Sequence, residues 1–332
     1  MNIGIKPQYE WNTKTLEFYE NSYQILRTPD FDDSTRLLKP QNGKQVLGNY
    51  GSAKTCRFCG KSEPEVTFKK VAHAFPEAIG NHVLTTLYEC DECNSFFGRT
   101  IENDYTNFFS LYHSVMQIKG KRGVPRCSFK VPCEKRTDSC AEYCVDIINA
   151  DDNQFEIRKC QEANGKYVEI NNKGFVIRKP VAGCCPIAVY KALVKMALTV
   201  MPIEELQLFE TARSWILQPE HENIFNKPLL VRYKMIPGFN VTKYPCYYLY
   251  KRKGDVWEYP YMLFQLTYAC YSLLIELPKD GSNSLIDKLD KIPFPEMPFY
   301  ANTEGIWDLS NKAVDKGYTN SMEFSYEMMQ EL

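Results

Sequence analysis

The sequence lacks the features of membrane-spanning and secreted proteins. No hydrophobic run approaches the roughly 18 apolar residues of a spanning helix, because the longest, 259–277, is interrupted by Gln265, Thr267, Ser272 and Glu276. The N-terminus, MNIGIKPQYE, has no apolar signal-peptide core. The 13 cysteines make up only about 4% of 332 residues, too few for a disulfide-built scaffold. We therefore expect a soluble protein with reduced thiols in the cytoplasm, without a membrane partner.

Two Cys-x-x-Cys pairs frame a segment that contains a histidine. The pairs are CRFC at 56–59 and CDEC at 90–93, and AHAFPEAIGN at 72–81 lies between them. Each pair can present two thiolates to one tetrahedral ion, so the spacing predicts a structural Zn²⁺ site formed by Cys56, Cys59, Cys90 and Cys93. Zinc would then order a loop that buries too little apolar surface to fold alone. On cysteine spacing alone, a zinc knuckle without chemistry explains the pairs equally well.

The residues between and after the pairs predict strand, strand and helix. Residues 66–71, VTFKKV, are rich in β-branched and aromatic types, and Pro76 ends this first strand just beyond His73. A second strand is expected over 83–88, after turn-forming residues at 80–81. Apolar residues recur at helical spacing from 94 to 112, which predicts one helix.

In this order of elements, residues 56–104 resemble the HNH endonuclease family, whose ββα-metal finger cleaves nucleic acid. The resemblance rests on the segments AHAFPE, GN and ECDECN. It implies that His73 is the general base that activates water, and that Asn94 holds a divalent cation at the start of the helix. It also implies that the four cysteines are the zinc site of the family's zinc-containing branch. Mg²⁺ or Mn²⁺ as catalytic ion, DNA rather than RNA as substrate, and prokaryotic defence against phage or foreign DNA follow from the same resemblance.

Phosphodiester hydrolysis suits these residue types. A neutral imidazole near pH 7 can deprotonate water, and an oxygen-ligated Mg²⁺ can neutralise charge on the leaving oxygen. One position departs from the family's pattern, because Ala72 stands where many members have an acidic ligand. We expect Glu77, Asn81 or His82 to supply the missing ligand, since a hairpin brings the two strand ends together. Glu102 would lie about 12 Å along a continuous helix from its start, too far to share the ion.

A basic stretch follows the expected helix. The net charge of the chain is only −1, but residues 119–136 carry seven basic side chains and one acidic one. If this stretch folds back beside the active site, we expect Lys119, Lys121, Arg122 and Arg126 to bind phosphates of nucleic acid. A solvated charged loop is the alternative.

The rest of the chain predicts a larger mixed domain, so the expected fold class is α+β with a small ββα-metal finger before it. Short alternating segments between 127 and 177 predict strands, and apolar faces predict helices over 186–200 and 202–215. Strand-like composition returns at 229–236, 246–251 and 262–277. We divide the chain into a lead-in that packs on the rest (1–50), the finger (51–118), an α+β domain for substrate binding, assembly or regulation (119–300), and a tail (301–332).

Three functional classes remain open at this point. The first is a metal-dependent HNH endonuclease that hydrolyses DNA, acting with or without a second copy or a regulatory partner. The second is a non-catalytic zinc-finger protein that binds nucleic acid, in which Ala72 marks a lost metal site. The third is an RNA-directed nuclease, or one that acts only when triggered. Within the site, His73 as a structural histidine and Asn94 as a helix cap are the alternatives.

Overall fold

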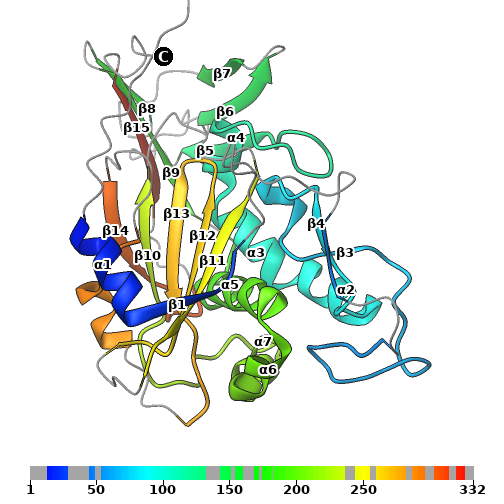
Figure 1. Cartoon of the computed structure of the whole chain (residues 1–332). Helices are drawn as coiled ribbons and strands as arrows, with labels where there is room; N and C mark the ends of the chain where they lie inside the picture. Colours follow the sequence, from blue (N-terminus) through cyan, green and yellow to red (C-terminus); the bar gives the residue numbers. More distant parts are fainter. Residues whose placement is uncertain are drawn as a thin grey trace, which may run out of the picture.

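A six-stranded antiparallel sheet organises the chain (Figure 1). Its strands, in spatial order, are β1 (Tyr23–Arg27), β11 (Cys246–Arg252), β12 (Met262–Tyr268), β13 (Tyr271–Glu276), β10 (Leu230–Met235) and β14 (Thr303–Asp308). The computed structural model describes residues 13–28, 45–48, 54–131, 143–150, 154–159, 168–171, 174–181, 183–235, 244–254, 259–281, 286–295, 303–313 and 319–325. Among these residues, no helix is both long enough and apolar enough to cross a membrane.

The central strands of this sheet are buried on both faces. In β12, Phe264 and Leu266 belong to the large hydrophobic core, whereas Leu263 belongs to a smaller core. Because alternate residues of a strand point to opposite faces, the two cores lie on opposite sides of the sheet. The smaller core includes Tyr19 of α1 (Thr13–Ser22) and Leu289 of the 3₁₀-helix η4 (Ile286–Lys291). The strands expected at 229–236 and 246–251 are confirmed, and 262–277 forms the hairpin β12–β13.

Helix α5 (Pro186–Val200) lies in the large core and matches the predicted 186–200 helix. It begins with Pro186 in its first turn, where the missing amide proton costs nothing. The hydroxyl of Tyr190 donates to the carbonyl of Glu276 at 2.7 Å, which joins α5 to the end of β13. The helix expected over 202–215 is divided into α6 (Ile203–Leu206), η3 (Gln207–Phe209) and α7 (Glu210–Ile216).

The finger shares the large core with the sheet. Its small sheet has the order β2 (Gln45–Leu47), β4 (Leu84–Thr86) and β3 (Ala72–His73), and is followed by α2 (Asp91–Arg99), α3 (Ile101–Phe108) and α4 (Ser110–Val115). Phe97 of α2 and Tyr105 of α3 are fully buried in the same core as β12, and the hydroxyl of Tyr105 donates to that of Tyr268 at 3.0 Å. The α+β class is confirmed, and the finger packs as part of the main body rather than as a detached module.

Three expectations for the finger and the tail are corrected. Residues 66–71 form no strand, and the single helix over 94–112 is broken at Thr100 (φ −113°, ψ −99°) and Phe109. The tail contributes strands, because β14 pairs with β10 and β15 (Thr319–Ser325) pairs with β9. The remaining elements are the small sheets β5 (Cys127–Val131), β6 (Tyr143–Ala150), β7 (Gln154–Lys159) and β15, β9 (Gly174–Pro180), β8 (Val168–Asn171). Strand β1, within residues 1–50, pairs with β11 at the edge of the six-stranded sheet.

Candidate active site and zinc knuckle

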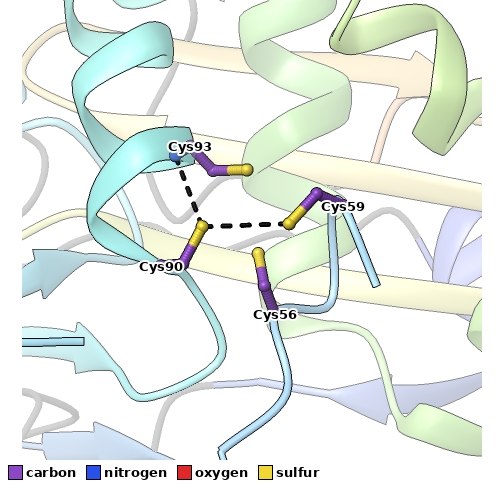
Figure 2. A group of neighbouring side chains, drawn as sticks. All are labelled: Cys56, Cys59, Cys90 and Cys93. Atoms are coloured by element: carbon purple, nitrogen blue, oxygen red, sulfur yellow. Dashed lines mark hydrogen bonds between the residues drawn. The ribbon is translucent and has the colours of Figure 1, made fainter. Parts of the chain in front are cut away.

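The four predicted zinc ligands converge on one point (Figure 2). Their sulfur atoms all lie within 4.8 Å of one another, and the sulfurs of Cys59 and Cys90 are 3.8 Å apart. Tetrahedral zinc with sulfur at about 2.3 Å requires sulfurs separated by about 3.8 Å. Among the residues that the structure describes, this is the only group of three or more His, Cys, Asp or Glu side chains placed to hold a metal. The donor set and its spacing therefore fit Zn²⁺.

Local structure explains how the cysteine pairs are presented. The first pair occupies a tight turn in which the amide of Gly60, at φ +75°, donates to the carbonyl of Cys56. In the second pair, Cys90 caps helix α2 and its sulfur accepts from the amide of Cys93 at 3.5 Å. A hydrogen bond from Cys93 lowers the pKa of Cys56, whereas burial raises that of Cys90. Because zinc binds thiolates, binding of Zn²⁺ to these cysteines would release thiol protons.

Arg57, inside the first cysteine pair, anchors the knuckle to α5. Its side chain is buried, and Nη1 donates to the carbonyls of Leu198, Thr199 and Met201 at 2.5, 2.7 and 3.0 Å. These carbonyls lie at the C-terminal end of α5, where helical partners run out and a cation is favourable. The guanidinium also lies over the ring of Tyr88, 4.1 Å from its centre. The cysteine knuckle, formed by Cys56, Cys59, Cys90 and Cys93, is thus joined to the main body by a charged contact.

His73 lies at the end of β3, in a hairpin with β4. Ala72 pairs with Thr86 and His73 with Thr85, so the two side chains of β3 face opposite sides. Ala72 is 1% exposed, whereas the side chain of His73 is 24% exposed. The position where the family often has an acidic ligand therefore points into the core in this chain.

The residues before β3 form a loop because the carboxylate of Asp91 accepts hydrogen bonds from backbone amides of that segment. The carboxylate of Asp91 accepts from the amides of Lys69 and Lys70 at 3.1 and 2.8 Å, and from the hydroxyl of Thr67 at 2.5 Å. The amide of Asp91 donates back to the carbonyl of Thr67 at 2.8 Å. These bonds replace a strand ladder over 66–71 and fix the loop to the start of α2.

The carboxylate of Glu77 lies close to His73. Glu77 begins the 3₁₀-helix η2 (Glu77–Ile79), and its Oε1 lies 4.0 Å from Nε2 of His73, with 27% of the side chain exposed. Partial burial lowers the pKa of His73 below its usual 6.5, while Glu77 opposes that shift. The imidazole is therefore neutral at pH 7 and can accept a proton.

Asn81 and His82, the other two candidate ligands, both have structural partners. The amide nitrogen of Asn81 donates to the carbonyls of Phe75 and Leu84 at 2.8 and 2.9 Å, and its oxygen accepts from the amide of Leu84 at 2.9 Å. Asn81 is 1% exposed, so we withdraw it as a candidate cation ligand. Nε2 of the exposed His82 lies 2.7 Å from the carbonyl oxygen of Lys119. One ring nitrogen of His82 is thus engaged.

Asn94 lies in the first turn of α2 but does not cap it, since Cys90 has that role. It is half-buried and one turn before Phe97, whose ring centre is 5.6 Å from Nζ of Lys195. Because residues three apart share a helix face, Asn94 lies on the side of α2 that faces this lysine. One turn further along, Gly98 has no atom within 4 Å of where a side chain would begin, so that end of the helix is open. Because Cys90 caps α2, the alternative that Asn94 serves as the helix cap is excluded.

A buried ion cluster under His73 was not predicted from the sequence. Nζ of Lys195 lies 2.9 Å from Oε1 of Glu102, 3.0 Å from Oε2 of Glu89 and 3.4 Å from the carbonyl oxygen of His73. Lys195 and Glu89 are almost completely buried, and burial raises the pKa of Glu89 to about 7. Because the helix breaks at Thr100, the continuous-helix distance used for Glu102 does not apply. A sequence signal did exist, since a lysine within an otherwise apolar helix is rarely buried unpaired.

The basic stretch turns back against the candidate active site. Residues 119–123 form a turn closed by a bridge between Gly120 and Gly123, and we call these residues the basic turn. A Cβ on Gly120 would lie 3.3 Å from Cα of Ala78 and 3.6 Å from the carbonyl oxygen of Glu77. A larger residue at position 120 would require the backbone of Ala78 to shift by a few tenths of an ångström. The charged side chains beside it are exposed: Lys119, Lys121, Arg122 and, after the turn, Arg126. Lys135 and Arg136, in the same basic stretch, lie outside the described residues.

Comparison with known proteins finds a family match within the finger. Residues 56–110 match the model of the HNH endonuclease family. The match begins at the first cysteine of the knuckle and contains His73, Glu77 and Asn94, whereas Lys195 lies outside it. No curated protein and no solved structure matches the chain.

Proposed function

We propose that this protein is a metal-dependent nuclease that hydrolyses phosphodiester bonds of DNA, on the premise that residues 56–110, which match the HNH endonuclease model, act as such a domain. One observation carries the proposal. His73 is held at the end of β3, partly exposed, with a carboxylate 4.0 Å away and a turn of basic side chains against the same loop. A partly exposed imidazole, a carboxylate and exposed basic side chains near one loop support the proposed roles of base, oxygen donor and phosphate-binding charge.

In the proposed reaction, His73 is the general base. Its pKa is lowered mainly by partial burial, so the ring is unprotonated at neutral pH. From this position Nε2 would remove a proton from a water molecule that attacks phosphorus. Glu77, 4.0 Å from Nε2, would stabilise the imidazolium that forms.

Asn94 and Glu77 are the residues that we assign to the catalytic cation. Both offer oxygen atoms, the donor type preferred by Mg²⁺ and Mn²⁺. When bound, the ion would neutralise the charge that develops on the leaving oxygen. His82 stays a weaker candidate, because one of its nitrogens already contacts the Lys119 carbonyl oxygen.

The basic turn is the proposed DNA-binding surface. Its lysines and arginine are exposed, and its backbone is fixed against Ala78 and Glu77 at Gly120. Phosphates on either side of the scissile bond would contact these side chains and Arg126 without sequence preference.

The proposal is tested with supercoiled plasmid and with single-stranded RNA. Purified protein is incubated with each substrate in Mg²⁺, in Mn²⁺ and in chelator, alongside His73→Ala and the remote control His221→Ala. We expect metal-dependent nicking of plasmid by wild type and His221→Ala only. Cleavage of RNA alone would replace DNA by RNA as the substrate, and nicking that needs added cell extract would indicate a triggered enzyme.

A non-catalytic zinc protein that binds nucleic acid is the second candidate. It is supported by Ala72, whose buried side chain offers no ligand, and by the absence of a second group of three metal-binding His, Cys, Asp or Glu side chains among the described residues. Tight plasmid binding without nicking in any metal would favour it.

We also propose, by analogy with the family, a role in prokaryotic defence against phage or foreign DNA. Cells that express wild type or His73→Ala are challenged with phage. Protection by wild type alone supports the role, and equal plating efficiency on both strains contradicts it.

A further inference from the structure

Helix α5 contributes a charge to the nuclease domain from outside the family match. Lys195 is 1% exposed, and its ammonium lies between two carboxylates of the finger. Glu89 directly precedes Cys90, one of the four clustered cysteines, and Glu102 lies in the first turn of α3, which packs against α5. One lysine of the main body thus contacts the connection before α2 and the helix that follows α2.

Lys195 stays charged in this position. Burial alone would lower its pKa, but Glu102 and Glu89 together raise it above the ordinary value. Two neighbouring carboxylates without a cation would repel each other in a medium of low dielectric constant. Neither oxygen of Glu89 makes a well-aligned hydrogen bond among the described residues, although Nζ of Lys195 is 3.0 Å away. The negative charge of Glu89 is therefore stabilised mainly by the positive charge of Lys195, and less by hydrogen bonding.

The third contact of Lys195 reaches the candidate base. Its Nζ donates to the backbone carbonyl of His73 at 3.4 Å, at the last residue of β3. The following amide, of Ala74, donates to the carbonyl of Leu84 and closes the hairpin. Restraint of the His73 peptide sets the direction in which the imidazole leaves the strand.

We propose that Lys195 is a positioning residue of the nuclease site, through which α5 holds the β3–β4 hairpin and His73 in register with α2 and the zinc knuckle. The kinetic part of this inference rests on the proposed nuclease function. The structural part does not, because it concerns the order of the hairpin itself.

Three variants separate positioning from general stability. Lys195→Met leaves two unpaired carboxylates, which destabilise the finger whether or not Lys195 positions His73. Lys195→Met combined with Glu89→Gln and Glu102→Gln removes every charge of the cluster. Lys191→Met is the matched control. Lys191 is equally buried, lies one turn earlier on α5, and donates to the carbonyls of Gln218 and Glu220 at 2.8 and 3.3 Å, away from the hairpin.

Amide hydrogen exchange is measured over residues 72–86 in each zinc-loaded protein whose circular dichroism is native. We expect exchange at Ala74 to be about 10-fold faster in the charge-free variant, and unchanged in Lys191→Met. In plasmid nicking, we expect kcat of the charge-free variant to fall about 10- to 100-fold with KM within about 3-fold of wild type, since misplacing a catalytic group by about 1 Å can cost that much.

Wild-type exchange and wild-type kcat in the charge-free variant would overturn the inference, as would equal losses in Lys191→Met. If wild type cleaves nothing, the proposed function fails. The exchange comparison then still decides whether Lys195 orders the hairpin.

Discussion

Arg57 offers a quantitative test of how the zinc knuckle is attached. Replacing Arg57 with leucine keeps a buried side chain against Tyr88 but removes all donors to the end of α5. The three carbonyls of Leu198, Thr199 and Met201 then face a site with no donor. We expect the knuckle to detach from α5 while its four cysteines still bind zinc.

The size of the effect follows from the geometry. Nη1 carries two protons for three carbonyls, so the contact amounts to two full hydrogen bonds, with the third carbonyl sharing one of them. A hydrogen bond to a charged group is worth about 1.5–3 kcal/mol net, which gives about 3–6 kcal/mol for two. Burial lowers the pKa of Arg57 to about 10, so the wild type carries a desolvation cost that leucine avoids. We therefore expect the lower end, about 3 kcal/mol.

Equilibrium urea unfolding of zinc-loaded protein, followed by the fluorescence of its four tryptophans, measures this loss, and zinc content is determined in parallel. Arg57→Lys is the matched control, because one ammonium keeps the charge but cannot reproduce the planar donor geometry. It should lie between wild type and Arg57→Leu. A loss below about 1 kcal/mol in Arg57→Leu with zinc retained would refute the anchoring role, since that is less than one such hydrogen bond.

Four further outcomes follow from the site. Cys90→Ser should abolish stoichiometric zinc binding, whereas the remote Cys184→Ser should keep it; retained zinc in Cys90→Ser would contradict the four-cysteine site. Alanine at the three basic side chains of the basic turn should make the slope of log K for DNA against log salt shallower by about 2.7, at about 0.9 per phosphate contact. Gly120→Val should cost about 1–3 kcal/mol, because Cα of Ala78 lies 3.3 Å from the new Cβ, whereas the open Gly98→Ala should cost nothing in thermal denaturation. The neutral form of His73 is the active one and its pKa is lowered, so the acid limb of kcat/KM should have its midpoint below pH 6.5; a midpoint above 6.5 would contradict a desolvated base.

The parts of the site that short-range patterns encode were predictable from the sequence. The two Cys-x-x-Cys turns predict that the four cysteine sulfurs lie together, because each turn provides two ligands and one tetrahedral ion requires four. Residues 186–200 carry an unbroken helical pattern after a proline, and α5 has those bounds. The strands over 229–277 were recognised for the same reason, since their side chains alternate between two apolar cores.

The predictions that were wrong concern segments whose structure depends on contacts between residues distant in the sequence. VTFKKV has strand composition, but Asp91, more than twenty residues away, accepts the amides of Lys69 and Lys70 and fixes a loop. The break at Thr100 brings Glu102 to Lys195, and no local periodicity reports a lysine that is 93 residues further along the chain. The segment of β14 has a weak strand pattern of its own, and its strand is defined by the hydrogen bonds that it forms with β10. Tertiary partners decide such segments, and sequence composition is silent on them.

The central claim is that His73 performs the chemistry of a phosphodiesterase. Single-turnover nicking of supercoiled plasmid by zinc-loaded wild type and His73→Ala, each in excess over DNA with Mg²⁺ or Mn²⁺, tests it most directly. We expect equal plasmid binding and a nicking rate at least about 100-fold lower for His73→Ala, the usual contribution of a general base. Equal nicking rates for the two proteins, or no nicking by wild type in either metal with or without cell extract, would contradict it.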